Sequence, residues 1–317
     1  MLSKRRGLLW VVLGLVTILA LAACQSPPGQ GSTARTAPPA PKKAESAPAA
    51  APMPRVPDEF AQQVSWVQSF DKPLDTTVFQ PETGGDGWGN KQVQYYTNSA
   101  ANTFTRDGQL VIRAKREDRG GQHYTSARLT TQGSFAPQYG MIVWQGVTLP
   151  EGVGTWSALW LYPANPKYTP ADMGKAGGSP DTTNGEIDVL EHIGLYPTEV
   201  NSSAHTFDNY PSHNEQSGQT LIGDATQAPH NYWLAWTPRY LAFGVDNHPP
   251  YYQVKKQPGD GPANWPYDQR YFLITNVAMG GDWGGAGKDQ YPPDGIDSSR
   301  SQWELKVDAI RYYPLKT

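Results

Sequence analysis

The chain has few of the features that mark several common protein classes. It has one cysteine in 317 residues, so no intrachain disulfide can form and core packing must hold the fold. The formal net charge is −3, and a mildly acidic balance argues against nucleic acid as a partner. Its glycine-rich stretches lack the strand–helix setting of a phosphate loop, so we expect no nucleotide or redox cofactor, and nothing indicates an oligomer.

Helical periodicity is also absent beyond the N-terminus, whereas glycine (32), proline (29), tyrosine (17) and tryptophan (11) are abundant. This profile predicts an all-β protein with many turns. Short alternating or aromatic runs bounded by turn residues suit a sandwich of two antiparallel sheets. The predicted strands are Val93–Thr97, Gln109–Ala114, Tyr124–Thr131, Tyr139–Leu149, Thr155–Tyr162, Gly185–His192, Tyr232–Thr237, Tyr240–Asp246, Tyr271–Met279 and Trp303–Tyr313.

The N-terminus has the layout of an export signal. Three basic residues precede an apolar run over 7–23, which is short for a membrane span. The run ends at Cys24 in Leu-Ala-Ala-Cys, which resembles the lipobox of bacterial lipoproteins and implies a lipid on that cysteine. An ordinary signal peptide cut near Ala22 or Ala23 and an uncleaved anchor are the alternatives. All three possibilities place the domain outside the cytoplasm. A lipid on Cys24 further predicts attachment to the bacterial cell envelope, at the outer membrane or cell surface.

Three segments follow from this reading. Residues 1–23 are the predicted lipoprotein signal peptide, and residues 24–55, rich in proline and alanine, are a predicted disordered tether. Residues 56–317 form the predicted folded domain. The insertion 163–183 and the glycine-rich 280–287 are predicted surface loops at the rim of a cleft, in conformations that the sequence does not predict.

The run Gly-Glu-Ile-Asp-Val-Leu-Glu at 185–191 carries the clearest chemical signal. On a strand, Glu186 and Asp188 share one face, and strict alternation would turn Glu191 into the core. Because a buried unpaired carboxylate is costly, we predict a β-bulge at 189–190 that returns Glu191 to the acidic face.

Three carboxyl groups lining one groove cannot all ionise near neutrality, because mutual repulsion and partial burial raise at least one pKa. Retaining glycosidases need this division, with one carboxylate as nucleophile and one protonated carboxyl as acid. The alternatives for an isolated acidic triplet are a solvated edge strand or a calcium site.

The sequence resembles glycoside hydrolase family 16, in its laminarinase-like branch. The hallmark Glu-aliphatic-Asp-two aliphatics-Glu is complete, and other motifs follow in the family's order between Trp66 and Tyr313. These motifs are Trp88-Gly89-Asn90, Gln94–Thr97, Tyr124–Leu129, Tyr139-Gly140, Leu149-Pro150, Trp156, Trp160, Trp233–Pro238, Phe272–Gly281 and Val307–Tyr312.

The resemblance implies a β-jelly roll with a concave substrate cleft and hydrolysis with retention of configuration. It gives Glu186 the place of the nucleophile, Glu191 that of the acid/base and Asp188 that of an assistant. Trp156 and Trp160 share a strand face and suit sugar rings, although core tryptophans would follow the same spacing. The segments that border the cleft in the family supply the remaining candidates for sugar binding: Asn90, Arg128 and His205.

The resemblance also implies a possible structural calcium ion at Asp308, for which a solvated aspartate is the alternative, and no catalytic cofactor. Two segments depart from the family, because 141–145 lacks its usual arginine and glutamate and Lys91-Gln92 replaces its usual Asn-Glu.

We therefore expect a monomeric, retaining endo-β-1,3-glucanase that acts on a polysaccharide, with mixed-linkage β-1,3-1,4-glucan as a further substrate. A galactan such as agar or carrageenan, transglycosylation, and a non-catalytic glycan-binding lipoprotein are the alternatives.

Overall fold

The computed structural model describes residues 50–174, 182–209 and 216–317, so the predicted signal segment and Cys24 lie outside the described residues. The described chain is built from strands, with short helical turns at 170–173 (3-10), 281–284 (α1) and 285–287 (3-10). The strands are β1 (Trp66–Ser69), β2 (Gln80–Glu82), β3 (Gln94–Tyr96), β4 (Thr103–Arg106), β5 (Gln109–Arg119), β6 (Gln122–Ser126), β7 (Arg128–Thr130), β8 (Gly140–Val147), β9 (Thr155–Pro163), β10 (Glu186–Ile193), β11 (Glu199–His205), β12 (Gln216–Leu221), β13 (His230–Trp236), β14 (Tyr240–Val245), β15 (Tyr252–Lys255), β16 (Tyr271–Met279), β17 (Gln302–Val307) and β18 (Ala309–Tyr313). The predicted all-β class is confirmed.

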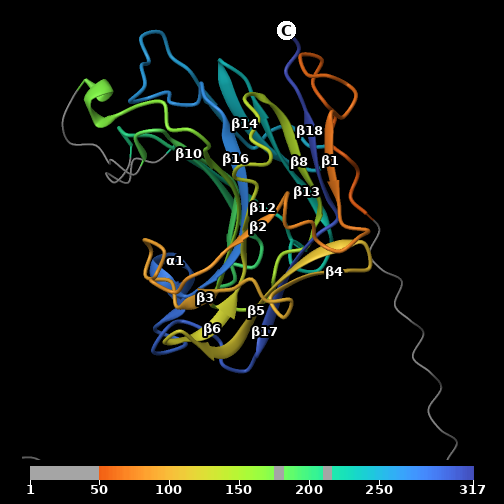
Figure 1. Cartoon of the computed structure of the whole chain (residues 1–317), viewed down its shortest axis with the longest axis vertical. Helices are drawn as coiled ribbons and strands as arrows, with labels where there is room; N and C mark the ends of the chain where they lie inside the picture. Colours follow the sequence, from red (N-terminus) through yellow and green to blue (C-terminus); the bar gives the residue numbers. More distant parts are fainter. Residues whose placement is uncertain (1–49, 175–181, 210–215) are drawn as a thin grey trace, which may run out of the picture. The chain divides into compact units, whose positions relative to one another are not determined.

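Hydrogen bonding divides these strands into three sheets (Figure 1). The front sheet has the order β12-β11-β10-β9-β16-β7-β2, and the back sheet has the order β1-β18-β8-β13-β14-β15. A third sheet, β17-β5-β6-β3 with β4 on β5, adds to the two sheets that the sequence predicts. The pairs are antiparallel except for β3 and β6, which run parallel.

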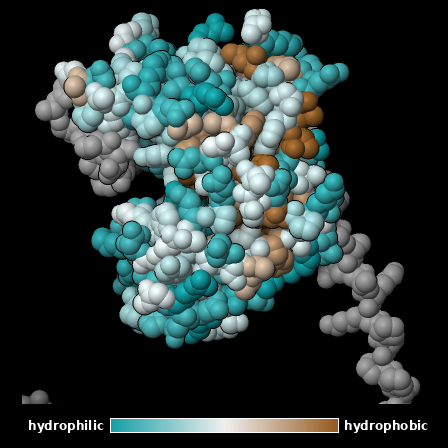
Figure 2. All heavy atoms as spheres, viewed as in Figure 1, coloured by the Kyte–Doolittle hydropathy of each residue, from teal (hydrophilic) through white to brown (hydrophobic). Residues whose placement is uncertain are grey.

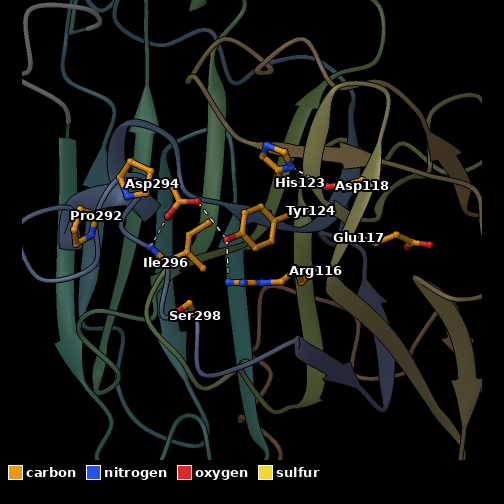
Figure 3. A pocket seen from close by; sticks show the side chains of 10 residues that line it. Arg116, Glu117, Asp118, His123, Tyr124, Pro292, Asp294, Ile296 and Ser298 are labelled. Atoms are coloured by element: carbon orange, nitrogen blue, oxygen red, sulfur yellow. Dashed lines mark hydrogen bonds and ion pairs between the residues drawn. The ribbon is translucent and has the colours of Figure 1, made fainter.

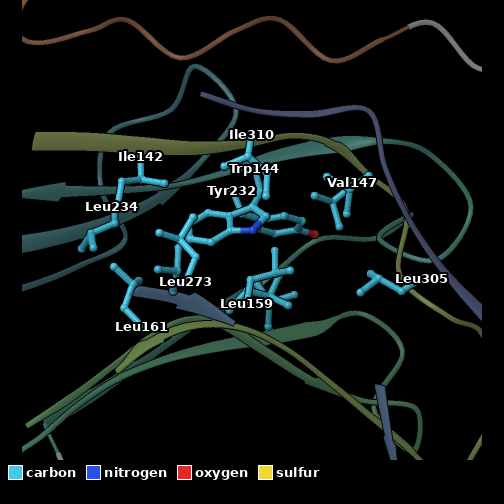
Figure 4. Close-up of a cluster of buried hydrophobic side chains, with 14 of the residues drawn as sticks. Ile142, Trp144, Val147, Leu159, Leu161, Tyr232, Leu234, Leu273, Leu305 and Ile310 are labelled. Atoms are coloured by element: carbon cyan, nitrogen blue, oxygen red, sulfur yellow. The ribbon is translucent and has the colours of Figure 1, made fainter. Parts of the chain in front are cut away.

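The main core lies between the front and back sheets (Figure 4). Side chains of β8 and β13 in the back sheet, such as Trp144 and Leu234, meet Leu159 and Leu161 of β9 and Leu273 of β16 in the front sheet. All five are buried, so each sheet shields the inner face of the other from water. The other face of the front sheet is thereby left for the site.

Eight predicted runs each overlap one strand, but two are wrong as single strands. The run Tyr124–Thr131 divides at Ala127 into β6 of the third sheet and β7 of the front sheet. The run Trp303–Tyr313 divides at Asp308 into β17 of the third sheet and β18 of the back sheet. Both runs keep a strand-like composition throughout because the chain passes from one sheet to another without a turn.

Six further strands of the described chain carry no signal that the sequence analysis used. Several are short or polar, and β11 and β12 together place Asn, Ser, Gln and Gly on both faces at one edge of the front sheet. Tertiary pairing rather than hydrophobic alternation makes these segments strands. They are β1, β2, β4, β11, β12 and β15.

The N-terminal side of the domain reaches beyond the predicted boundary at residue 56. Asn231 Nδ2 donates hydrogen bonds to the main-chain oxygens of Ala51 and Pro52, each over 3.0 Å. Further along, Phe60 is buried against Met141 and Val143 on the outer face of the back sheet.

None of the helices in the described parts of the chain is long and apolar enough to cross a membrane.

Candidate active site

Strand β10 begins directly after a glycine that the fold requires. Gly185 has φ +75°, a conformation that side chains rarely adopt, and a Cβ there would lie 2.6 Å from Pro266 Cγ and 2.8 Å from Tyr271 Oη. Its N–H donates to Thr182 O over 2.9 Å. This turn starts the strand so that its first residue, Glu186, faces away from the core.

The predicted bulge in β10 is confirmed. Asp188 lies opposite Trp160 of β9, whereas Leu190 lies opposite Leu159, so Val189 is an extra residue in the strand. Ile187, Val189 and Leu190 are all buried in the core. Glu191 lies opposite Ala158 and returns to the face of Glu186 and Asp188, where it is partly exposed. The bulge therefore brings the three acidic residues onto one face of the front sheet.

The acidic residues share this face with a histidine from the neighbouring strand. His205 of β11 lies opposite Glu186, and its Nε2 is 3.0 Å from Asp188 Oδ2. Burial raises the pKa of Asp188 to about 8, and burial together with the Asp188 carboxylate raises that of Glu186 to about 8. The pair therefore retains a proton at a pH where exposed carboxyl groups are ionised.

The two predicted sugar-binding tryptophans lie beside these acids on β9. Trp156 Nε1 donates a hydrogen bond to Glu191 Oε1 over 3.1 Å, and its ring meets Trp283 of α1 edge-on with centroids 5.6 Å apart. Trp160 Nε1 donates to Asn276 Oδ1 over 2.8 Å. Both tryptophans are partly exposed, and Trp160 also packs against a small buried apolar cluster, so their contact with sugar stays a prediction.

Arg128 lies between two aromatic rings on the same face. Its guanidinium carbon is 4.8 Å from the ring centre of Trp88 and 4.7 Å from that of Trp160, which are cation–π distances. Its Nε donates to Glu82 Oε2 on the adjacent strand β2. Arg128 thus has a partner on each side and fixes the aromatic rings around it.

Asn90 lies at the edge of this region in the loop that precedes β3. Its main-chain oxygen accepts a hydrogen bond from Asp282 N over 2.8 Å, and the neighbouring Lys91 Nζ is 2.8 Å from Asp282 Oδ1. These contacts join the loop to α1, which also carries Trp283. They also give the unusual Lys91 of the sequence a partner.

Three residues of this region were not among the predicted site residues. Trp88 and Asn276 lie within motifs that were noted, and Trp283 lies in the glycine-rich segment, but none was named as a site residue. Asn276 lies opposite both Arg128 and Ala158, and its Nδ2 donates to Tyr96 Oη over 3.1 Å. The alternation along β16 is the signal that could have found it, because Asn276 is polar between Ile274 and Ala278.

Asp308 lies apart from these residues, at the junction of β17 and β18. Its Oδ1 accepts a hydrogen bond from Gln109 Nε2 over 2.6 Å, and a Cβ at Gly146 would lie 1.9 Å from its Oδ2. Calcium takes six to eight oxygen ligands. Around Asp308, the described chain gathers no group of three histidine, cysteine or acidic residues. Main-chain oxygens and water would have to supply most ligands, so the predicted calcium ion stays a prediction.

The face that carries the acids borders a hollow in the surface. Figure 2 shows the molecule hollowed on one side, where Figure 1 places β10 above and α1 below. A separate pocket of about 520 Å³ lies in the third sheet, between the β5–β6 hairpin and the 292–298 loop (Figure 3). That pocket contains Arg116, Tyr124 and Asp294 but none of the β10 acids. It is therefore not the site of the acidic chemistry.

Comparisons with known proteins show the family to which the chain is similar. The family model described as glycosyl hydrolases family 16 matches residues 88–292. The chain is 34% identical over 258 residues to a β-glucanase of Rhodothermus marinus, covering 79% of this chain and 85% of the relative. It is 29% identical over 276 residues to glucan endo-1,3-beta-glucosidase A1 of Niallia circulans, covering 78% of this chain and 37% of that protein.

A likeness to a solved structure confirms the predicted jelly roll. The X-ray structure of the laminarinase from Rhodothermus marinus matches with a TM-score of 0.72 at 33% identity, covering 80% of this chain and 98% of that one. The match extends over most of the residues from which the three sheets are built. The chain therefore belongs to the glycosyl hydrolases of family 16.

Proposed function

We propose that this glycoside hydrolase cleaves internal β-1,3 linkages of a β-glucan with retention of configuration. The observation that carries the proposal is the bulge at Val189, which sets Glu186, Asp188 and Glu191 on one face beside Trp156. Acidic pairs of this kind perform double displacement in retaining glycosidases. The β-glucanase and laminarinase names of the relatives support the choice of glucan.

In the first step, the Glu186 carboxylate attacks the anomeric carbon while the glycosidic C–O bond breaks. Glu191 gives its proton to the leaving oxygen, which departs as a sugar hydroxyl group. The hydrogen bond from Trp156 Nε1 fixes the Glu191 carboxyl for this transfer. A proton shared between Asp188 and Glu186 resides on Asp188 when Glu186 acts as the nucleophile.

In the second step, Glu191 removes a proton from water, and the water oxygen attacks the anomeric carbon of the glycosyl-enzyme. The ester bond to Glu186 breaks and its carboxylate is restored. Asp188 assists by stabilising the returning charge on Glu186, because its burial favours the protonated form that can donate a hydrogen bond. No atom in either step comes from a metal or an organic cofactor.

For the substrate, we propose that Trp160 and Arg128 on the front sheet, and Asn90 beside α1, contact sugar rings. Arg128 holds the rings of Trp88 and Trp160 in place, and aromatic faces pack well against pyranose rings. A panel of laminarin, mixed-linkage glucan, agarose and carrageenan, assayed for reducing sugar, tests this proposal. Release from laminarin supports it, whereas release from a galactan alone would replace it with the galactanase alternative.

We propose further that Cys24 carries a lipid that anchors the protein, as a monomer, to the bacterial cell envelope. The apolar run ending in Leu-Ala-Ala-Cys supports this proposal. Fractionation of cells that express the wild-type chain and the Cys24→Ala variant tests it. The wild type should sediment with membranes and the variant should not, and equal distribution of the two would reject the lipid anchor.

A calcium ion at Asp308 is the last part of the proposal. Its test is the melting temperature measured with calcium chloride and with a chelator, in the wild type and in Asp308→Asn. A rise with calcium that the variant lacks would support the ion. An unchanged wild-type melting temperature would leave Asp308 as the hydrogen-bond acceptor of Gln109 alone.

A further inference from the structure

Three side chains on two neighbouring strands of the front sheet bring metal-binding atoms close together. Glu186, Asp188 and His205 each offer one ligand atom, and these atoms all lie within 4.8 Å of one another. The residues belong to the paired strands β10 and β11, with Glu186 opposite His205 and Asp188 opposite Ser203. Backbone pairing on rigid strands, rather than a loop, therefore fixes their spacing.

The contact between Asp188 and His205 supports a ligand between them. Asp188 is 3% exposed, and its Oδ2 lies 3.0 Å from His205 Nε2, an ion-pair distance whose geometry makes no hydrogen bond. A buried carboxylate oxygen without a hydrogen bond is costly. Two ligands of one tetrahedral zinc ion lie roughly 3.3–3.5 Å apart, given bonds of about 2.0–2.2 Å. The observed separation is within a few tenths of an ångström of that value.

We propose that Glu186, Asp188 and His205 bind a zinc ion, and that bound zinc reversibly blocks the enzyme. Two carboxylates and an imidazole form a nitrogen–oxygen ligand set that zinc accepts, and three protein ligands leave a fourth position for water. Calcium and magnesium prefer oxygen ligands alone, so the imidazole disfavours them. The ligand set therefore favours zinc over calcium and magnesium.

The expected consequence is competition between zinc and the polysaccharide. A zinc ion on the Glu186 carboxylate occupies the group that must attack the anomeric carbon. Zinc binding itself does not depend on the proposed function, whereas the inhibition rests on it. Direct binding and hydrolysis are therefore measured separately, so that failure of one is distinguishable from failure of the other.

The first measurement is isothermal titration of zinc chloride into the full chain, purified without a histidine tag. We expect one zinc per wild-type chain, and an affinity at least about tenfold lower in His205→Gln and in Asp188→Asn, as for the loss of a metal-site partner. The matched control is His123→Ala, which removes an exposed histidine paired with Asp118 over 2.7 Å in the separate pocket. Its zinc affinity should equal that of the wild type.

The visible absorption of bound cobalt, measured with cobalt chloride, reports on the metal site itself. A four-coordinate site gives an intense visible spectrum, which a general change in structure would not produce. Far-ultraviolet circular dichroism verifies that each variant is folded, and if His205→Gln does not fold, Asp188→Asn and the cobalt spectrum decide. Absence of saturable binding by the wild type, or unchanged zinc affinity in both ligand variants, would overturn the site. Equal binding of calcium would overturn the choice of zinc.

Hydrolysis of laminarin completes the test. Zinc should raise the apparent KM, and a chelator should restore the initial rate. If zinc binds through these residues and the rate does not change, the inhibition is rejected while the site stands. If the wild type hydrolyses no glucan at all, the proposed function fails, and the titration still decides the metal site.

Discussion

At the scale of single residues, the site depends on which polar atoms hold the acids. Glu191 is held by the indole N–H of Trp156, and Asp188 is approached by His205. The sequence predicted all four as site residues, although it expected Trp156 and His205 to contact sugar. Their contacts with carboxyl groups could not be predicted, because they depend on the register between neighbouring strands.

Replacement of Trp156 by phenylalanine keeps an aromatic ring but removes the hydrogen bond to Glu191. A hydrogen bond contributes about 0.5–1.5 kcal/mol to a neutral carboxyl and about 1.5–3 kcal/mol to a carboxylate, so we expect kcat on laminarin to fall roughly twofold to a hundredfold. The control is Trp66→Phe, because Trp66 stacks on Phe135 outside the site with centroids 3.9 Å apart. An unchanged kcat in the Trp156 variant would show that the hydrogen bond does not position the acid.

The raised pKa values of Glu186 and Asp188 predict how stability depends on pH. Unfolded carboxyl groups titrate near pH 4, whereas burial raises both native pKa values to about 8. Between these values the native state binds more protons than the unfolded state. The stabilisation is therefore complete below about pH 4, and it is lost as the pH rises through about 8.

Replacement of Asp188 by asparagine should make this loss shallower. Each excess proton contributes a slope of at most about 1.4 kcal/mol per pH unit to the free energy of unfolding. Urea denaturation of the wild type and the variant at pH 5, 6, 7 and 8 measures the slope. Asp118→Asn, which alters an exposed carboxyl group, is the control. A slope in Asp188→Asn as steep as in the wild type would contradict the burial argument.

At the scale of elements, the bulge of β10 was predictable, because strict alternation would turn the Glu191 carboxylate into the core.

The apolar segment 141–144 has both of its faces buried, which the sequence of this strand alone does not explain. Ile142 and Trp144 face the main core, whereas Met141 and Val143 lie under Phe60 on the other face of the back sheet. The segment is continuously apolar because the N-terminal residues cover its second face, and this packing accounts for part of its departure from the family pattern.

Deletion of Val189 should remove the bulge without turning Glu191 away from the site. In the register with β9, Leu190 already lies opposite Leu159 and Glu191 opposite Ala158, so a regular strand would preserve both pairs. We expect a folded protein that loses about 1–3 kcal/mol from the missing buried valine and retains activity within about tenfold. Urea denaturation and laminarin hydrolysis measure the two effects.

Insertion of an alanine between Leu190 and Glu191 is the control for this deletion, because it adds a residue to β10 instead of removing one. It turns Glu191 to the core face, where an unpaired carboxylate is costly, and it should abolish hydrolysis. If the insertion remains active while the deletion is inactive, the account of the bulge is wrong.

At the scale of the whole molecule, the sequence predicted the class of the fold and the location of the acids but not the third sheet. The junctions at Ala127 and Asp308 are invisible to alternation, because the chain remains extended as it passes between sheets. The polar strands β11 and β12 were missed for a related reason, since their pairing partners lie elsewhere in the chain. One of them carries His205, so part of the site depends on an element without a hydrophobic signal.

The whole molecule also explains why the front sheet is available for a polysaccharide. The back sheet covers its inner face, and the third sheet and α1 lie beside its other face (Figure 1). Family membership and the geometry of β10 lead to the same central claim, which is that Glu186 is the nucleophile of a β-glucan hydrolase.

The most direct test of that claim is reducing-sugar release from laminarin by the wild type and by Glu186→Gln at equal concentration. The substitution keeps the size of the side chain and removes the attacking carboxylate, so the account predicts release by the wild type and a loss of at least about a thousandfold in the variant. Release by the variant at a rate close to that of the wild type would contradict the account.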